Sequence, residues 1–183
     1  MTRIFDILFS FIGLVLLSPI LFVLIVIGFF DTGSPIFRQE RVGKDKKPFN
    51  LMKFRSMHVN VPSVATHLAN SSSITRFGGF LRKSKLDELP QLWNVLVGDM
   101  SLVGPRPNLF NQEELIEERG SRGVYFVRPG ITGLAQINKI DMSTPKNLAE
   151  TDSKMIHELN ILVYFKYIFL TVFGKGFGDP IKN

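Results

Sequence analysis

A run of 24 uncharged residues, Ile7 to Phe30, constrains this chain more than any other feature of its sequence. As a straight helix the run would reach about 36 Å, which exceeds the roughly 30 Å hydrocarbon core of a bilayer. A cleaved secretory signal should end in small residues, whereas this run ends in GFFDTGSP. We therefore expect a membrane-associated segment rather than a signal peptide.

Two features of the run bear on how it meets the membrane. Ser18-Pro19 lies near its centre, where a proline removes one helical hydrogen bond and kinks the helix. Basic residues flank the run on both sides, and positive charge favours the cytoplasmic side. They are Arg3 before the run and Arg38, Arg41, Lys44, Lys46 and Lys47 after it. This pattern favours a re-entrant helix-break-helix, with a single transmembrane span as the alternative.

The residues after the run predict a small, mostly helical α/β domain at 32–183, behind a membrane segment at 1–31. Residues 35–57 have the pattern of a short β-hairpin, with two Phe-rich segments around the turn GKDKKP. Thr75 is suitably placed to cap a short helix that runs to Lys83.

Two further apolar segments predict helices. One has the i, i+3, i+4, i+7 spacing of an amphipathic helix. Its apolar residues are Leu89, Leu92, Trp93 and Leu96. The other, 159–173, contains Lys166 and is too short and too charged to span a bilayer. Its aromatic residues suit packing on the core, contact with the membrane interface, or both.

Charge and cysteine content narrow the functional class. The net charge of +6 favours an anionic partner, such as nucleic acid, a membrane surface or a phosphorylated small molecule. The chain has no Cys, which excludes disulfides and cysteine-based zinc sites, and its three scattered His have no metal-ligand spacing. The uncharged run argues against a nucleic-acid-binding protein. A noncatalytic membrane adaptor is the other alternative to an enzyme.

The stretch RKSKLDELP, residues 82–90, places Asp87 and Glu88 directly after three cations. One interpretation is structural, because Ser84-x-x-Asp87 matches a capping box and Glu88 would then be a first-turn acid. The other is functional, because an ionised aspartate among cations can hold a divalent metal ion or attack phosphorus. Adjacent helical residues point about 100° apart, so the two carboxylates would have different tasks.

Four arginines are candidates for phosphate binding. In PRP (105–107), two prolines fix the backbone around Arg106 and organise its guanidinium for bidentate phosphate contact. Arg128 has a similar Arg-Pro context, Arg82 precedes the carboxylates, and Arg55 lies on the expected hairpin. The alternative role of the hairpin cations is adhesion to anionic lipid. These cations are Arg38, Arg41, Lys53 and Arg55.

Several of these motifs together resemble one known family. KSKLDELPQLWNVLVGDMSLVGPRP (83–107) resembles the signature of the bacterial sugar transferases, the monotopic phosphoglycosyl transferases that begin lipid-linked glycan assembly. The resemblance extends over nearly the whole chain. It includes FRQERVGKDKKPFNLMKFRSM (37–57), VRPGITGLAQIN (127–138) and LSPIL (17–21).

The resemblance implies an enzyme that moves a sugar 1-phosphate from a UDP-sugar to a polyprenol phosphate, such as undecaprenyl phosphate, and releases UMP. This would be the first membrane step in assembling O-antigen, capsule, exopolysaccharide or glycoprotein glycans. The family's nucleophile, which forms a covalent phospho-sugar intermediate, matches Asp87. Its essential glutamate matches Glu88, with a metal or proton role, and Mg²⁺ is the expected cofactor, held by these two carboxylates. Pro-Arg-Pro matches around Arg106, and the family's helix break matches Ser18-Pro19.

The resemblance also implies a location. It predicts a monotopic protein on the cytoplasmic face of the bacterial inner membrane, with a re-entrant helix hairpin at 1–31 and a cytoplasmic catalytic domain with interfacial amphipathic helices at 32–183. No nucleic-acid partner is expected, and a homodimer is one option for the oligomeric state. The chain departs from the common Asn-Gly-Arg pattern at 138–140, where it has Asn-Lys-Ile. The sequence therefore does not name the sugar.

Overall fold

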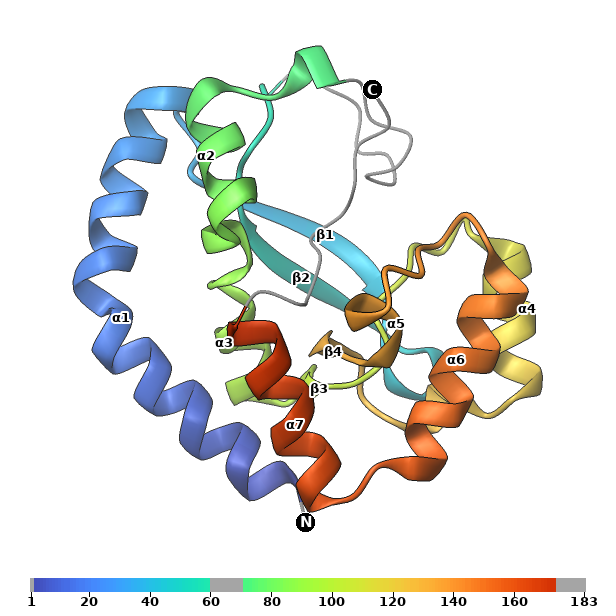
Figure 1. The fold of residues 1–183 in the computed structure, drawn as a ribbon. Helices are drawn as coiled ribbons and strands as arrows, with labels where there is room; N and C mark the ends of the chain where they lie inside the picture. Colours follow the sequence, from blue (N-terminus) through green and yellow to red (C-terminus); the bar gives the residue numbers. More distant parts are fainter. Residues whose placement is uncertain (1, 60–70, 174–183) are drawn as a thin grey trace.

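The computed structural model describes residues 2–59 and 71–173. A long N-terminal helix lies along one side of a small, mostly helical body that contains short strands (Figure 1). The mostly helical body with a short β-hairpin is as the sequence predicted. The elements are α1 (Thr2–Thr32), β1 (Ile36–Val42), the 3₁₀ turn η1 (Lys44–Lys46), β2 (Pro48–Phe54), η3 (Ser71–Ser73), α2 (Arg76–Ser84), η4 (Leu86–Glu88), α3 (Gln91–Val97), β3 (Ser101–Val103), α4 (Glu113–Ser121), η5 (Val124–Phe126), β4 (Gly130–Thr132), α5 (Leu134–Ile137), α6 (Pro145–Glu158) and α7 (Ile161–Val172).

The helix α1 continues through Ser18 and Pro19 without interruption, and it bends along its length (Figure 1). Pro19 has no N–H with which to bond the carbonyl of Val15, four residues earlier. The Ser18 hydroxyl donates to that carbonyl instead, at 2.8 Å. The Val15 carbonyl is therefore satisfied, and the helix-break-helix predicted here is instead one continuous helix.

Both ends of α1 are tied to the same body. Near its start, the Arg3 guanidinium donates to the carbonyls of Val95 and Leu96, at 2.6 and 3.0 Å, in the last turn of α3. Near its end, Asp31 accepts a hydrogen bond from the Thr75 hydroxyl at 2.7 Å. Thr75 also caps α2, as predicted from the sequence. Because both ends contact one body, α1 lies against that body instead of leading away from it.

A buried carboxylate joins α1 to two other elements. Asp6 is only 2% exposed. It accepts hydrogen bonds from the Ser101 hydroxyl at 2.9 Å, the Leu102 N–H at 2.9 Å and the Tyr164 hydroxyl at 2.8 Å. Burial and the Asp6 carboxylate raise the pKa of Tyr164, which keeps its hydroxyl a donor. This one side chain therefore fastens α1 to β3 and α7.

The outer face of α1 is apolar and exposed. Within the described ranges, α1 is the single helix that is long and apolar enough to cross a membrane. Its exposed large side chains include Ile4, Ile7, Leu8, Phe11, Ile12, Val15, Leu16, Ile20, Phe22, Val23, Phe29 and Phe30. Helix α7 buries Tyr164 and Tyr167 in the body and exposes Leu162, so it combines core packing with an exposed apolar surface.

The helix α3 turns its polar residues inward. The buried Asn94 side chain donates to the carbonyl of Asn50 at 2.8 Å and accepts from the N–H of Met52 at 2.9 Å, which ties α3 to strand β2. Leu92 lies against Gly13 of α1, and Trp93 is half exposed. The apolar spacing correctly predicted this helix, and Leu89 packs against the body as expected. The side of α3 that is fully buried in the body, however, carries Asn94 and Val95.

Two pairs of short strands lie in the part of the body that carries the candidate functional site. β1 and β2 form the predicted antiparallel hairpin, and β3 pairs in parallel with β4. At the end of β3, the backbones of Gly104 and Gly130 touch so closely that a Cβ on Gly130 would lie 2.0 Å from the Gly104 nitrogen. The Gly130 N–H donates to the Pro105 carbonyl at 2.8 Å. These glycines let the segment after β3 pack against the segment that enters β4.

Replacing Asp6 by alanine should destabilise the fold, because it leaves the donors of Ser101, Leu102 and Tyr164 without their acceptor. We expect a loss of about 2–4 kcal/mol in the free energy of unfolding, visible as a lower Tm of the detergent-solubilised protein. Tyr164→Phe removes only one of these donors and should cost about 1 kcal/mol. An Asp6→Ala protein as stable as the wild type would contradict the role assigned to this carboxylate.

Candidate functional site

The adjacent carboxylates Asp87 and Glu88 lie in the short turn η4, between α2 and α3. Lys85 ends α2 in the left-handed conformation, with φ 58° and ψ 15°, which a non-glycine residue adopts only with some strain. This residue reverses the chain, so the two carboxylates lie on a separate turn that follows α2.

The structure does not support the interpretation of Asp87 as a helix-capping residue. The Ser84 hydroxyl donates back into α2, to the carbonyls of Phe80 and Leu81 at 2.8 and 3.1 Å. Ser84 is the last residue of α2, and neither η4 nor α3 has a side-chain cap at its N-terminus. Asp87 is therefore not the acid of a capping box.

Glu88 is held by two cations from distant parts of the chain. Its Oε1 accepts from Lys53 Nζ of β2 at 3.3 Å and from Arg106 Nη2, in the segment after β3, at 3.0 Å. All three side chains are only 16% exposed. In such a partly dry environment these charge-assisted hydrogen bonds are stronger than surface ion pairs. Glu88 thus fixes two cations beside its neighbour Asp87.

Asp87 is a partly buried carboxylate with an altered acidity. Burial, and to a lesser extent the charge of Glu88, raises its pKa, while the cations Lys53, Arg82 and Arg106 oppose the shift, and the resulting pKa is about 6. The group is therefore mostly ionised at neutral pH and more basic than an exposed aspartate. A basic, ionised carboxylate surrounded by cations suits attack on a phosphorylated electrophile.

The structure brings together only some of the arginines proposed from the sequence. Arg82 and Arg106 act on Asp87, and Arg82 Nε also donates to the Ser56 hydroxyl at 2.8 Å. Arg55 instead donates to the Ser34 carbonyl at 2.8 Å. Arg128 donates to the Gly98 carbonyl at 2.7 Å. Arg55 therefore fastens the segment after α1, and Arg128 caps the C-terminal end of α3.

Lys53 belongs to the site. From the sequence it stood only among the hairpin cations, whose alternative role is lipid adhesion, and not among the four arginines selected for phosphate binding. The alternation of side chains along β2 could have identified Lys53 as an inward-facing residue. Phe49 and Leu51 are buried, and Lys53 follows them at the two-residue period of a strand. A lysine in an inward register of a hairpin needs an anionic partner, and Glu88 supplies it.

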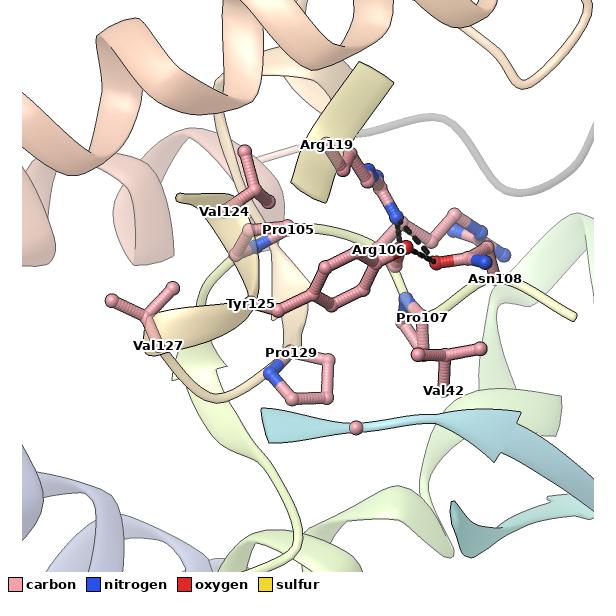
Figure 2. A pocket seen from close by; sticks show the side chains of 11 residues that line it. Val42, Pro105, Arg106, Pro107, Asn108, Arg119, Val124, Tyr125, Val127 and Pro129 are labelled. Carbon is pink, nitrogen blue, oxygen red and sulfur yellow. Dashed lines mark hydrogen bonds between the residues drawn. The ribbon is translucent and has the colours of Figure 1, made fainter. Parts of the chain in front are cut away.

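A small pocket lies behind the turn that carries Arg106 (Figure 2). Its lining is mainly apolar, and neither Asp87 nor Glu88 contributes to it. The lining includes Val42, Pro105, Pro107, Val124, Tyr125, Val127 and Pro129. We therefore assign the reacting groups to the charged cluster of Asp87, Glu88 and their cations, and regard this pocket as part of the support of the Arg106 turn.

Asp87 and Glu88 are also the two residues here that could hold a metal ion. No group of three or more His, Asp or Glu side chains gathers at one point in residues 2–59 and 71–173. Mg²⁺ typically needs only one or two carboxylates when waters and substrate phosphates complete its shell. The pair therefore fits a metal ion that arrives with a phosphorylated ligand, since the cations around it disfavour a bare metal ion.

Comparisons with known proteins give a consistent result. A family model described as bacterial sugar transferase matches residues 1–176. The UDP-glucose:undecaprenyl-phosphate glucose-1-phosphate transferases of Klebsiella pneumoniae and Escherichia coli K12 are 43% and 41% identical to this chain, over 96% and 94% of its length. The chain spans only 40% and 39% of those two proteins. The exopolysaccharide production protein PSS of Rhizobium leguminosarum bv. phaseoli is 38% identical over 96% of this chain and 97% of its own length.

Asp87→Asn should stabilise the protein in a pH-dependent way. The pKa of Asp87 is raised from 3.8 to about 6, so ionisation of this group costs the folded state more than the unfolded chain. This destabilisation is fully present above pH 6 and absent below pH 3.8, where the group is protonated in both states. We expect the variant to gain on the order of 2 kcal/mol at pH 7.5, with the gain closing as the pH falls from 6 to 4. Thermal unfolding across this pH range measures it.

Glu150→Gln is the control for this measurement, because the Glu150 side chain is 53% exposed. A Tm difference between Asp87→Asn and the wild type that stayed constant from pH 4 to pH 7.5 would argue against the environment described for Asp87.

Proposed function

The chain belongs to the bacterial sugar transferase family, and we propose that it transfers a sugar 1-phosphate from a UDP-sugar to a polyprenol phosphate, releasing UMP. The names of its relatives from Klebsiella pneumoniae and Escherichia coli support this reaction. The observation that carries the proposal is the partly buried carboxylate of Asp87, which does not cap a helix and lies among the cations Lys53, Arg82 and Arg106. That environment suits a nucleophile acting on a diphosphate.

In the first half-reaction, an oxygen of Asp87 attacks the phosphorus that carries the sugar. The bond from this phosphorus to the bridging oxygen of UMP breaks, and UMP leaves with the electron pair. The product on the protein is a phospho-sugar linked to the aspartyl oxygen. The raised pKa of Asp87, about 6, makes the carboxylate a better nucleophile while leaving it mostly ionised at neutral pH.

In the second half-reaction, a phosphate oxygen of the polyprenol phosphate attacks the same phosphorus. The bond to Asp87 breaks, the carboxylate is restored, and the sugar remains linked to the lipid through a diphosphate. Two half-reactions suit these substrates, because one is soluble and the other is held in a membrane. The two substrates then use one site in turn and need never occupy it together.

The cations would bind and neutralise the diphosphate. Arg106 and Lys53 are already fixed by Glu88 at 3.0 and 3.3 Å, so little reorganisation is needed when charge develops on the phosphates. The planar guanidinium of Arg106 suits phosphate oxygens in particular. In this proposal Glu88 places these two cations and is the second carboxylate available to a metal ion.

Mg²⁺ is the metal ion that we propose for this site. Asp87 and Glu88 would hold it together with phosphate oxygens, and when bound it would supply further neutralisation of the charge on the phosphates.

We also propose that α1 is a re-entrant membrane helix on the cytoplasmic face. Both of its ends are tied to one body, through Arg3 and Asp31, and a charged body cannot be drawn across a bilayer. A helix whose ends share one body and whose outer face is apolar suits entry and exit on the same side. The curved course of α1, which contains Pro19, fits such a shallow path (Figure 1).

In a cell this reaction would be the first membrane step in assembling a glycoconjugate, such as O-antigen, capsule, exopolysaccharide or a glycoprotein glycan. The name of the Rhizobium relative supports an exopolysaccharide pathway. Other relatives are named for galactose and N-acetylgalactosamine, so these sugars and glucose are the first to test.

The wild-type protein should release UMP from one of these UDP-sugars when undecaprenyl phosphate and Mg²⁺ are present. We expect Asp87→Asn to lower the rate at least about a thousandfold, because it removes the nucleophile. Glu150→Gln, at an exposed position away from the site, should remain active. Asp87→Asn turnover near the wild-type rate would exclude the proposed nucleophile.

A re-entrant α1 predicts that both termini lie on the cytoplasmic side. Tags at the N- and C-terminus should both resist protease added to intact spheroplasts, and both should be cleaved in inside-out vesicles. Cleavage of the N-terminal tag alone in spheroplasts would instead identify α1 as a transmembrane span.

A further inference from the structure

A buried ion pair lies behind the Arg106 turn, apart from the charged cluster described above. Arg119 of α4 is 1% exposed and Asp152 of α6 is fully buried. The Nε and Nη2 atoms of Arg119 donate to one oxygen of Asp152, Oδ2, at 2.9 and 2.6 Å. Arg119 contributes to the lining of the small pocket behind the turn, and neither it nor Asp152 is part of the charged cluster around Asp87.

The remaining nitrogen of the Arg119 guanidinium points at the turn. Its Nη1 donates to the backbone carbonyl of Arg106 and to the Asn108 side-chain oxygen, both at 2.9 Å (Figure 2). Tyr125 donates to the same Asn108 oxygen at 3.0 Å. Because the guanidinium is planar, fixing one edge against Asp152 also fixes the direction of Nη1. The ion pair therefore sets the position of the backbone at Arg106.

We propose that Arg119 is a positioning residue, which holds the Arg106 turn so that the Arg106 side chain reaches Glu88 beside Asp87. Asp152 is the counterion that orients Arg119. The inference rests on the proposed function of the site and adds to it two residues outside the charged cluster. It connects α4 and α6 to the reacting carboxylate through three hydrogen-bonded steps: Asp152 to Arg119, Arg119 to the Arg106 carbonyl, and the Arg106 side chain to Glu88.

The chemistry of the pair supports positioning more than stability. A buried ion pair is often no more stabilising than apolar residues of similar size. Here the second oxygen of Asp152, Oδ1, is buried and has no hydrogen-bond partner within the described residues, a defect that lowers stability. An apolar pair would fill the same space but could not donate to the Arg106 carbonyl and Asn108.

The test uses Arg119→Lys, which keeps a cation for Asp152 but lacks the planar fork that also reaches the turn. Arg119→Met would leave Asp152 buried without its counterion and is prone to unfold, so the second variant is the double change Arg119→Met with Asp152→Leu. Arg122→Met, at the C-cap of the same helix and in a more exposed ion pair with Glu118, is the matched control. All variants are made in the full chain and assayed for UMP release with undecaprenyl phosphate.

We expect Arg119→Lys and the double variant to lower kcat about 10- to 100-fold, with the KM for the UDP-sugar changed less than about threefold, because a small displacement of a charged group costs this much. In an Arg106→Met background the same changes should have no further effect on kcat, because Arg119 acts through Arg106. Arg122→Met should match the wild type. If Arg119→Lys lowered kcat by the same factor in the wild-type and the Arg106→Met backgrounds, the proposal would be overturned, because Arg119 would then have a general structural role.

Hydrogen–deuterium exchange gives a readout that does not depend on activity. Arg119→Lys should speed exchange in the segment around Arg106 and leave α1 and α3 unchanged. Unchanged exchange at that segment would overturn the positioning role. A wild-type protein that releases no UMP from any UDP-sugar would contradict the proposed function, and the exchange result would still decide whether Arg119 holds the turn.

Discussion

The ion pairs of Glu88 with Lys53 and Arg106 hold the candidate site together. They join the β1–β2 hairpin, the turn η4 and the segment after β3 at one carboxylate oxygen, so three distant parts of the chain meet beside Asp87. Glu88 pairs with two of the three nearby cations, Lys53 and Arg106. Burial disfavours the ionised form of the neighbouring Asp87 carboxylate. Lys53, Arg82 and Arg106 outnumber the two carboxylates by one charge. A site of this kind favours a diphosphate ligand and a nucleophile that acts on it.

In the proposed function, the helix α1 connects the site to the membrane surface. Its outer face is apolar, while its inner face carries the polar groups Arg3, Asp6 and Asp31, which bind the body. Asp6 holds β3, and β3 leads directly into the turn that carries Arg106. The depth of α1 in a membrane and the position of a phosphate-binding arginine would therefore be set together, which suits an enzyme with one lipid-linked substrate.

Local sequence signals predicted α1, the hairpin and the Thr75 cap, because each depends on residues close in sequence. The buried face of α3 could not be predicted from apolar spacing alone. That spacing marks an apolar face, but part of this face meets α1 and the surface, while Asn94 turns inward and bonds backbone groups of β2. The presence of a positive charge also could not predict which cations contact the carboxylates. Lys53 reaches Glu88 through the register of the hairpin, and Arg128 caps a helix instead.

The central claim is that Asp87 attacks the phosphorus bearing the sugar, and mass spectrometry of the protein tests it most directly. The protein is incubated with its UDP-sugar and Mg²⁺ without a lipid acceptor, quenched, and digested. The account predicts a phospho-sugar adduct on the peptide that contains Asp87, formed with an equal amount of UMP and discharged when polyprenol phosphate is added. Transfer to the lipid that required both substrates together and left no adduct on this peptide would contradict it.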